Sequence, residues 1–305
     1  MRYTFRQIEY FVAAGDTLSI TLASEKVHIS QPAISAAISH LEAEFGIQLF
    51  IRHHAQGLSL TPEGMRFLRE ARSLLAHADE LQGVARELSD TVSGQLEVAC
   101  LVTLYPLLVP ELLHDFRRRF RQTQVHAVPG NQAEVFAALR QGEVSLALTY
   151  DMDLPADITI EPLAPLPPIV FVAGSHPVAR RKSIALAALA DEPFLLLDLP
   201  ISRDYFLSLF QLAGLRPNIA GRFEHWEVIR SLVARGDGYS IGNVRPRNQA
   251  SLDGRRLAYL FLDDNSPPLS IGIAEMRGTR RNKLADAFVV TCRELVRADS
   301  LPGMV

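Results

Sequence analysis

Apolar residues in the first sixty positions recur every three or four residues, which is the period of amphipathic helices. A first helix is predicted over residues 5–14, and its inward residues are Phe5, Ile8, Phe11 and Val12. A second short helix is predicted over residues 19–26, with the Ser19 hydroxyl as its N-terminal cap.

The third predicted helix, over residues 31–45, has two contrasting faces. Its apolar stripe, spaced by four and three, comprises Ile34, Ile38, Leu41 and Phe45. Its opposite face is small and mildly polar, and comprises Pro32, Ser35, Ala36, Ser39 and Ala43. We expect Ser30 to cap this helix by accepting a hydrogen bond from its first turn, and Gly46 to end it. Such a helix can approach another surface closely, although an ordinary surface helix of a bundle has the same pattern.

Residues 47–61 contain two short arms of alternating apolar and polar residues, with Gly57 in the region between them. This pattern predicts a small β-hairpin. Three helices followed by a hairpin describe a winged helix-turn-helix, which binds DNA. Arg52, His53 and His54 lie at the predicted tip, where they could contact phosphate groups.

A long helix is predicted from residue 62, because Thr61 can cap it, Pro62 suits its first position and Glu63 suits its positive end. No proline follows until after Gly94. Apolar residues then alternate steps of four and three, namely Phe67, Ala71, Leu74, Ala78, Leu81, Ala85 and Leu88. This heptad seam is typical of a coiled coil, so we interpret it as a dimerisation helix. A helix buried in its own domain is the alternative.

From residue 95 onwards, buried strands alternate with helical segments, which predicts parallel βαβ units. The predicted strands are 96–102, 125–129, 145–150, 168–174, 194–198, 218–223, 239–243, 257–262 and 269–275. The predicted helices are 106–121, 132–140, 203–213, 226–235 and 282–297. The proline-rich stretches 162–168 and 265–268 are the expected crossovers between two α/β lobes.

The composition is compatible with several domains, but it does not decide whether the protein binds DNA. The chain has 305 residues, of which 48% are hydrophobic, enough for two or three domains. Its net charge is −3, and the first 62 residues hold four Lys and Arg against five Asp and Glu. A nucleic-acid binder should carry a basic surface, so this balance argues against DNA. Helix N-termini and hydroxyls can hold phosphates instead, and Glu9, Glu25 and Glu42 can face away from the partner.

The sequence shows no secretory signal and no apolar stretch of about 20 residues, so we expect a cytoplasmic protein that does not enter a membrane. Cys100 and Cys292 belong to no CxxC or Cys/His cluster, and we interpret both as small buried apolar residues. A redox-sensing pair is the alternative. No cofactor and no metal site is expected.

Several polar residues follow predicted strands or begin predicted helices, where α/β proteins bind small ligands. They are Thr103, Asn131, Thr149, Ser202, Tyr205 and Trp226. Hydroxyls and exposed N–H groups at helix starts favour an anion such as a carboxylate. Helix capping is the simpler role for Thr103 and Ser202, exposed surface for Arg203 and Tyr205, and core packing for Trp226.

Gly238-Tyr-Ser-Ile-Gly242 matches the GxSxG nucleophile elbow of hydrolases. The elbow needs a strand before the serine and a helix after it, but Asn243-Val-Arg-Pro-Arg247 cannot start a helix there. The catalytic histidine should also lie downstream, whereas the last histidine is His225. We therefore expect Ser240 to be a residue of a buried strand and the protein not to be an enzyme.

Several motifs resemble the LysR-type transcriptional regulators over essentially the full length of the chain. They are Phe11-Val-Ala-Ala14, Ser19-x-Thr21-x-Ala23, His28-Ile-Ser-Gln-Pro-Ala-Ile-Ser35, Leu41-Glu-x-Glu-Phe-Gly-Ile-Gln-Leu-Phe50, Leu60-Thr-Pro-Glu-Gly64 and Leu232-Val-Ala-Arg-Gly-Asp-Gly-Tyr-Ser-Ile241. The resemblance implies an α/β protein with an N-terminal all-α winged helix-turn-helix in residues 1–61 and a dimerisation helix in 62–92. It also implies an effector domain in 93–305 that resembles type 2 periplasmic binding proteins. We expect lobe I to comprise about 93–162 and 268–305, and lobe II about 163–267.

The resemblance further implies a homodimer or homotetramer on promoter DNA, a small-molecule inducer between the lobes and contact with RNA polymerase. Positions that face DNA in the family are matched here by Thr21, Ser30, Gln31, Pro32, Ser35, Ser39 and Arg52, and His53 is the neighbouring candidate. Thr103 and Asn131 match inducer-contacting positions.

The chain departs from the family where Ala36 and Ala37 replace a basic or long polar pair and Leu22 replaces a basic residue. Base readout needs hydrogen-bonding groups, so Gln31 is the best candidate and much specificity should come from DNA shape and half-site spacing. A ligand sensor of the same fold without DNA binding is the alternative. The sequence does not name the inducer, the target genes or the direction of regulation.

Overall fold

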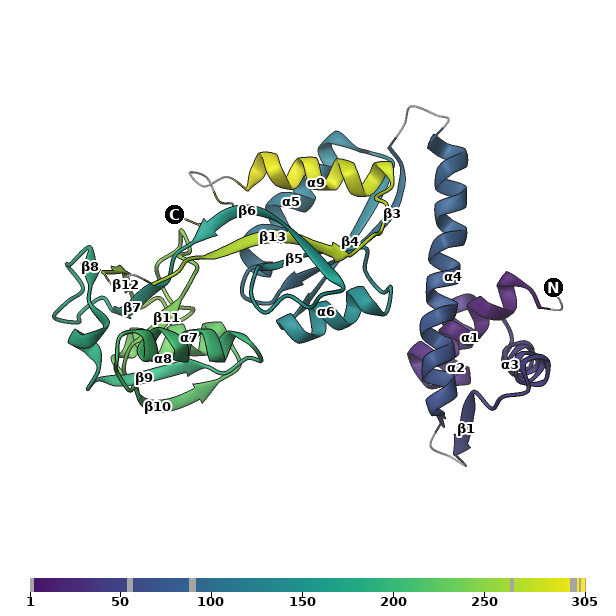
Figure 1. Ribbon diagram of the computed structural model, residues 1–305, viewed down its shortest axis with the longest axis horizontal. Helices are drawn as coiled ribbons and strands as arrows, with labels where there is room; N and C mark the ends of the chain where they lie inside the picture. The colour runs from purple at the N-terminus through teal and green to yellow at the C-terminus, as the bar shows by residue number, and fades with distance from the viewer. Residues whose placement is uncertain are drawn as a thin grey trace. The chain divides into compact units, whose positions relative to one another are not determined.

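The computed structural model describes residues 3–53, 57–87, 92–263, 266–296, 301 and 303–304. For residue 53 and several residues between 76 and 87 it describes the backbone alone. The chain divides into two compact units, one formed by residues 1–91 and the other by most of residues 92–305 (Figure 1). We describe each unit by itself.

Three helices open the first unit: α1 (Phe5–Thr17), α2 (Ile20–Val27) and α3 (Gln31–Phe45). The Thr4 side chain and Gln7 form a capping box at the start of α1, which runs three residues further than predicted. The Ser19 hydroxyl accepts a hydrogen bond from Leu22 N at 3.3 Å, as expected for the cap of α2. The third helix has the predicted bounds and ends at Gly46, whose φ is +64°.

The predicted cap of α3 is wrong. Ser30 occupies the N-cap position, but its hydroxyl makes no capping hydrogen bond. The reason lies in the first turn, where Pro32 has no N–H and Ala33 N already donates to the Ser30 carbonyl at 3.0 Å. The Ser30 hydroxyl is therefore exposed at the start of α3 without a role in the cap.

A two-stranded antiparallel hairpin follows, made of β1 (Phe50–His53) and β2 (Gly57–Leu60). Gly57 pairs with His53 and begins the second arm, and residues 54–56, with His54, lie outside the described part. The long helix α4 (Pro62–Glu87) starts as predicted, because the Thr61 hydroxyl accepts from Gly64 N at 2.8 Å. That hydroxyl also donates to the Gln48 carbonyl at 2.6 Å and so joins the helix to the preceding loop.

The first two positions of the predicted seam in α4 lie in the core of their own unit. Ala71 is buried there, and the Phe67 ring contacts Phe11 and Phe45 with centroids 5.2 and 4.9 Å apart. Both residues therefore contribute to the packing of their own unit, and their place in an interface between two copies stays a prediction. Leu74 is 39% exposed and Ala78 is partly exposed, whereas the side chains of Leu81 and Ala85 and the whole of Leu88 lie outside the described part.

Lobe I of the second unit contains a five-stranded sheet in the order β4-β3-β5-β13-β6. Its strands are β3 (Gly94–Leu101), β4 (Thr123–Gly130), β5 (Leu146–Tyr150), β6 (Ile158–Leu166) and β13 (Leu269–Met276). Helices α5 (Tyr105–Arg119) and α9 (Lys283–Leu295) cover one face, and α6 (Gln132–Arg140) covers the other (Figure 1). Alternate residues of β3 divide accordingly: Val98 and Cys100 pack in the α5 cluster and Ala99 in the α6 cluster.

Lobe II contains two smaller sheets, in the orders β11-β7-β12-β8 and β10-β9. The strands are β7 (Ile169–Ala173), β8 (Ser183–Ile184), β9 (Pro193–Leu197), β10 (Asn218–Phe223), β11 (Ser240–Gly242) and β12 (Leu257–Leu262). Its helical segments are η1 (Leu186–Leu189), α7 (Ser202–Leu212) and α8 (Trp226–Arg235). The two lobes share one large hydrophobic cluster.

The expected parallel pairing holds only in part. Strand β3 is parallel to both β4 and β5, and β9 is parallel to β10. In contrast, β13 runs antiparallel to β5 and β6, and β11 and β12 run antiparallel to β7. The chain returns to lobe I through β13 after completing lobe II, so this strand enters the sheet from the opposite end. Strand β6 was not predicted as a strand.

Candidate functional site

The outer face of α3 is exposed as predicted. Ile34, Ile38 and Leu41 are buried, whereas Gln31, Pro32, Ala36 and Ser39 are exposed and Ser35 is partly so. Phe45, the last residue of the apolar stripe, stays 39% exposed, with its ring against Tyr3 and Phe67. Ala37 is buried, so only Ala36 of the unusual alanine pair faces outwards. The three buried residues fix the helix while its small outer face stays open to a partner.

The hairpin contributes a cation to the same surface. The exposed Arg52 of β1 places its Nη2 atom 3.5 Å from the Ser39 Oγ atom of α3. Thr21, in the first turn of α2, is exposed as well. The structure therefore brings Ser39 and Arg52 together, and the His53 side chain lies outside the described part.

Two acidic residues of this unit, Asp16 and Glu42, have internal partners. The Asp16 carboxylate contacts Lys26 Nζ and Arg72 Nη2, both at 2.7 Å. Burial tends to raise the pKa of Asp16, but the hydrogen bonds from Lys26 and Arg72 outweigh burial and lower that pKa. The Glu42 carboxylate accepts from Leu49 N at 2.8 Å and from Phe50 N at 3.2 Å. Glu42 thus holds the turn between α3 and β1.

In lobe I, Thr103 lies near Tyr150, a buried tyrosine that the sequence analysis missed. Thr149 precedes Tyr150 on β5, so its side chain lies on the opposite face of the sheet. Burial raises the pKa of Tyr150, and an interaction with the Thr103 side chain acts in the opposite direction without outweighing burial. The Thr149 side chain is fully buried, and its Oγ1 atom has no hydrogen-bond partner. Leaving such a hydroxyl unsatisfied costs about 1–3 kcal/mol, so Thr149 is a candidate for contact with a ligand.

Asn131 and Gln132 lie at the start of α6, next to these residues in the fold. Asn131 Oδ1 accepts from Glu134 N at 3.1 Å and Glu134 Oε2 accepts from Asn131 N at 2.7 Å, so Asn131 caps the helix. Gln132 is completely buried and its Nε2 atom donates to the Tyr150 and Met152 carbonyls. Its Oε1 atom has no partner. Gln132 is therefore a second polar residue that the sequence analysis missed.

In lobe II, Tyr205 is buried, which excludes the exposed-surface alternative for this residue. Its hydroxyl donates to the Pro267 carbonyl at 3.2 Å and accepts from Asn243 Nδ2 at 3.1 Å. Asn243 also donates to the Leu166 carbonyl at 3.0 Å, so the pair contacts both chain segments that connect the lobes. Burial raises the pKa of Tyr205 to about 12, so its hydroxyl keeps its proton at neutral pH.

The start of α7 differs from the expected anion site. The backbone at Ile201 has φ of +69° and ψ of −53°, and Ser202 N donates to the Pro200 carbonyl at 2.8 Å. Arg203 N donates to the Leu199 carbonyl at 2.9 Å, so the chain itself uses these two N–H groups. The positive φ is strained for a β-branched residue, and Ile201 packs against the α6 cluster of lobe I. Ser202 is buried, with its hydroxyl as the group that could serve a ligand.

Trp226 begins α8 and combines the two roles that the sequence left open. Its ring packs edge-on against Phe171, with centroids 4.9 Å apart. It also lies against Gly242, where an added Cβ atom would come within 2.3 Å of the indole. Its Nε1 atom is buried without a hydrogen-bond partner. One side of the indole therefore packs in the core, and its N–H group is a donor without an acceptor.

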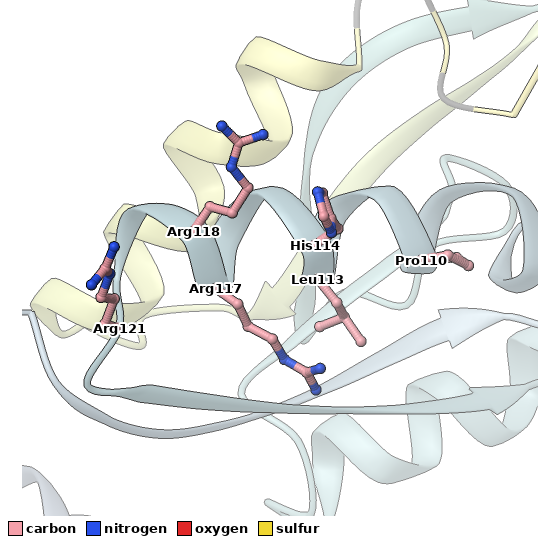
Figure 2. A pocket seen from close by; sticks show the side chains of 6 residues that line it. All are labelled: Pro110, Leu113, His114, Arg117, Arg118 and Arg121. Atoms are coloured by element: carbon pink, nitrogen blue, oxygen red, sulfur yellow. The ribbon is translucent and has the colours of Figure 1, made fainter.

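Two hollows of the second unit lie away from these residues. One, of about 740 Å³, follows α5 and is lined by Pro110, Leu113, His114, Arg117, Arg118 and Arg121 (Figure 2). The figure shows all six side chains on one helix and the residues just after it, so this hollow is an open surface. The second, of about 1030 Å³, lies within lobe II and carries many cations.

Neither Ser240 nor the two cysteines has the surroundings of a reactive group. Ser240 is fully buried inside β11, and its hydroxyl donates to the Leu195 carbonyl at 2.6 Å, so it does not form a strand-to-helix elbow. Cys100 and Cys292 are free thiols, both fully buried, and burial raises the pKa of each. Among the described residues, no group of three or more His, Cys, Asp or Glu residues could hold a metal ion, and no helix is both long and apolar enough to cross a membrane.

A helix-turn-helix with a β-hairpin wing, followed by a two-lobed α/β unit with unsatisfied polar groups, defines a DNA-binding regulator with a ligand-binding domain. Residues 5–65 match the bacterial regulatory helix-turn-helix protein model of the lysR family, and residues 89–297 match the LysR substrate binding domain. The chain belongs to the LysR family of transcriptional regulators.

Other transcriptional regulators are similar to this chain over most of its length. The structure of HinK, a LysR family transcriptional regulator from Pseudomonas aeruginosa, is 35% identical, with a TM-score of 0.65 over 97% of this chain and 99% of that one. OxyR of Escherichia coli K12, a DNA-binding transcriptional dual regulator, is 28% identical over 93% of this chain and 94% of its own length. The transcriptional regulator CysB of Haemophilus influenzae is 29% identical over 77% and 74%.

Proposed function

We propose that this regulator binds its operator through the outer face of α3, the first turn of α2 and the Arg52 side of the hairpin. The contact between Ser39 and Arg52 carries this proposal, because it joins α3 and the hairpin into one exposed polar surface. The side chain of Gln31 is the best base reader, because its amide can pair with adenine. The exposed Ser30 hydroxyl and the guanidinium of Arg52 are suited to phosphate groups.

Operator discrimination tests the base-reading role of Gln31. Binding to the DNA upstream of the protein's own gene is compared with binding to unrelated DNA of equal length, at several salt concentrations. A Gln31→Ala variant should lose discrimination by about fivefold or more, while its affinity for unrelated DNA changes little. Unchanged discrimination would show that Gln31 reads no base. Absence of binding to either DNA at low salt would instead favour a sensor that does not bind DNA.

We propose that the effector site includes Thr103, Thr149, Ser202, Tyr205 and Trp226, with Gln132, Tyr150 and Asn243 added to the predicted set. Three atoms support it: Thr149 Oγ1, Gln132 Oε1 and Asn243 Oδ1 are buried without partners. Thr149 Oγ1 can donate or accept a hydrogen bond, whereas the two amide oxygens only accept, because their N–H groups already donate to Tyr150, Met152, Leu166 and Tyr205. A small molecule that carries a donor group, such as an amino acid with its ammonium, suits these atoms. Asn131 would act by capping α6.

A thermal-shift screen with small carboxylates and amino acids tests the effector site. A ligand that binds the folded protein raises its melting temperature in proportion to the logarithm of ligand concentration above Kd. A Thr149→Val variant should fold normally and lose most of that response. An equal response in this variant would place the ligand elsewhere.

We propose that two copies of the chain associate through α4 from Leu74 onwards, with Ala78, Leu81, Ala85 and Leu88 continuing the seam. The exposure of Leu74 supports this assignment. A Leu74→Glu variant should shift the assembly towards monomers in sedimentation equilibrium, whereas Glu70→Gln, on an exposed position one turn earlier, should not. The assembled regulator would act in the cytoplasm at promoters, where RNA polymerase is the expected partner.

The peroxide response that gives some relatives their name is not transferred to this chain. A redox-sensing cysteine is an exposed thiol of low pKa. Cys100 and Cys292 have the opposite properties, because both are buried and both pKa values are raised.

A further inference from the structure

The hollow within lobe II is surrounded by basic side chains from four segments of the chain. They are Arg180, Arg181 and Lys182 after β7, Arg235 at the end of α8, Arg245 after β11, and Arg255 and Arg256 before β12. The remaining lining includes Tyr259 and Phe261 of β12. We refer to this feature as the cationic hollow.

Among the described residues, most of these cations have no carboxylate partner. Asp253 pairs with Arg235, at 3.5 Å, and with Arg255. Within the described part of the chain, Arg180, Arg181, Lys182, Arg245 and Arg256 form no ion pair. Like charges held around one hollow repel each other, so an anion placed among them gains from several at once.

Two polar groups of the lining also have unused donors. Arg245 Nε is buried and has no hydrogen-bond partner. The Tyr259 hydroxyl accepts from Arg230 Nε at 3.1 Å, which leaves its own proton for another acceptor. Burial raises the pKa of Tyr259, although Arg230 acts against burial, so the phenol is protonated at neutral pH. Arg230 itself is already bound to Glu227 and to the Asn248 and Ala250 carbonyls.

An apolar part lies beside these donors. Phe261 lines the hollow and is 51% exposed, and Leu257 and Ala258 lie on the same strand. A ligand that carries an organic group as well as negative charge could therefore bury apolar surface against β12.

We propose that the cationic hollow binds a small phosphorylated molecule, at a site separate from the proposed effector residues. Phosphate oxygens suit several guanidinium groups at once, because each guanidinium can donate two parallel hydrogen bonds. A small ligand fits better than a DNA backbone, because the cations surround a hollow instead of following a ridge. This inference does not depend on the residues assigned to the effector site.

Calorimetric titration of the full chain with inorganic triphosphate tests the proposal, with ionic strength held constant by potassium chloride. We expect saturable binding of one triphosphate per chain. Arg181→Gln combined with Arg256→Gln, both on exposed residues, should weaken it by about tenfold or more, because each change removes charge-assisted hydrogen bonds to phosphate oxygens. The matched control is Arg216→Gln with Arg280→Gln, two exposed arginines outside the hollow, which should stay within about twofold of wild type.

Equal binding by all three proteins, or no saturable heat beyond that of potassium chloride, would overturn the proposal. So would a loss of affinity for double-stranded DNA in the Arg181/Arg256 variant with unchanged triphosphate binding, because the hollow would then be a DNA surface. Adenosine triphosphate should bind more tightly than inorganic triphosphate if the apolar part is used. Weaker binding of adenosine triphosphate would overturn the organic character assigned to the ligand.

Discussion

The two units of this regulator differ in the burial and the hydrogen bonding of their polar groups. In the first unit, polar side chains are exposed on α3 and the hairpin, or are paired internally as Asp16 and Glu42 are. In the second unit, six buried polar atoms of the described side chains have no hydrogen-bond partner or ion pair, namely those of Gln132, Thr149, Trp226, Tyr239, Asn243 and Arg245. An exposed polar face suits a large polyanion, whereas buried unsatisfied groups suit a small ligand that replaces water. Four predictions sharpen this contrast.

The largest expected effect concerns the frame that holds the DNA-binding face. A Cβ atom added at Gly64 would lie 2.0 Å from the Leu49 carbonyl oxygen, which is a backbone atom and cannot move alone. Gly64→Ala should therefore destabilise the protein by about 3 kcal/mol or more, despite the higher helix propensity of alanine. Denaturant unfolding measures the loss.

Gly15→Ala is the matched control, because it also lies in a helix of the first unit. An added Cβ atom there would meet only the Leu68 methyl groups, at 2.9 and 3.0 Å, and that side chain can shift. We expect a change within about 1 kcal/mol. Equal losses in both variants would show that the contact with Leu49 does not set the geometry of this unit.

The second prediction compares two buried threonines of the second unit. The Thr291 hydroxyl donates to the Ala287 carbonyl at 2.9 Å, whereas Thr149 Oγ1 has no partner. Thr291→Val should lose about 1 kcal/mol of stability, and Thr149→Val should lose none or gain a few tenths. Urea unfolding measures the free energy of unfolding of both variants, and an unchanged m-value shows that the comparison is valid. A loss of 1 kcal/mol or more in Thr149→Val would mean that its hydroxyl is satisfied in the free protein.

A smaller effect is expected at Asp16 in the first unit. Its pKa is lowered in the folded protein, so the stability it contributes is complete above the unfolded value near 4 and is lost as the pH falls below it. Asp16→Asn should therefore reduce stability at pH 7 by about 1 kcal/mol or less, and by a smaller amount at pH 3. Thermal unfolding of both proteins at the two pH values measures the difference. An equal difference at both pH values would exclude an ionic role.

The smallest effect is expected from oxidation. Hydrogen peroxide at concentrations that oxidise exposed thiols should leave Cys100 and Cys292 unmodified in the folded protein and should not change DNA affinity. Mass spectrometry of the intact chain detects any modification. Formation of a disulfide between the two cysteines, with a change in DNA affinity, would restore the redox alternative.

The sequence predicts best those features that depend on nearby residues. The start of α4 follows from Thr61 and Pro62 and the end of α3 from Gly46, because caps act over one turn. Strand β6 was missed because Pro162 and Pro165 made its segment resemble a crossover. It lies at the edge of its sheet, where strands tolerate proline.

The same difference between local and long-range features separates the two candidate sites. The outer face of α3 follows from helical period alone, whereas Tyr150, Gln132 and Asn243 emerge only when distant strands meet. Asn243 is an example, because it directly follows β11 but bonds to Tyr205 and to the Leu166 carbonyl, 38 and 77 residues away in the sequence. The failed cap at Ser30 was in principle predictable, because Pro32 removes one of the two N–H groups that a capping hydroxyl uses.

The affinity of an Arg52→Ala variant for DNA upstream of the protein's own gene tests the proposed DNA-binding surface most directly. Arg69→Ala, which removes an exposed arginine of α4, is the matched control. If α3 and the hairpin form one DNA-binding face, Arg52→Ala should weaken binding by about threefold to tenfold and reduce the salt dependence by about one phosphate contact, while Arg69→Ala changes neither. Equal affinities and equal salt dependence in the two variants would contradict the account.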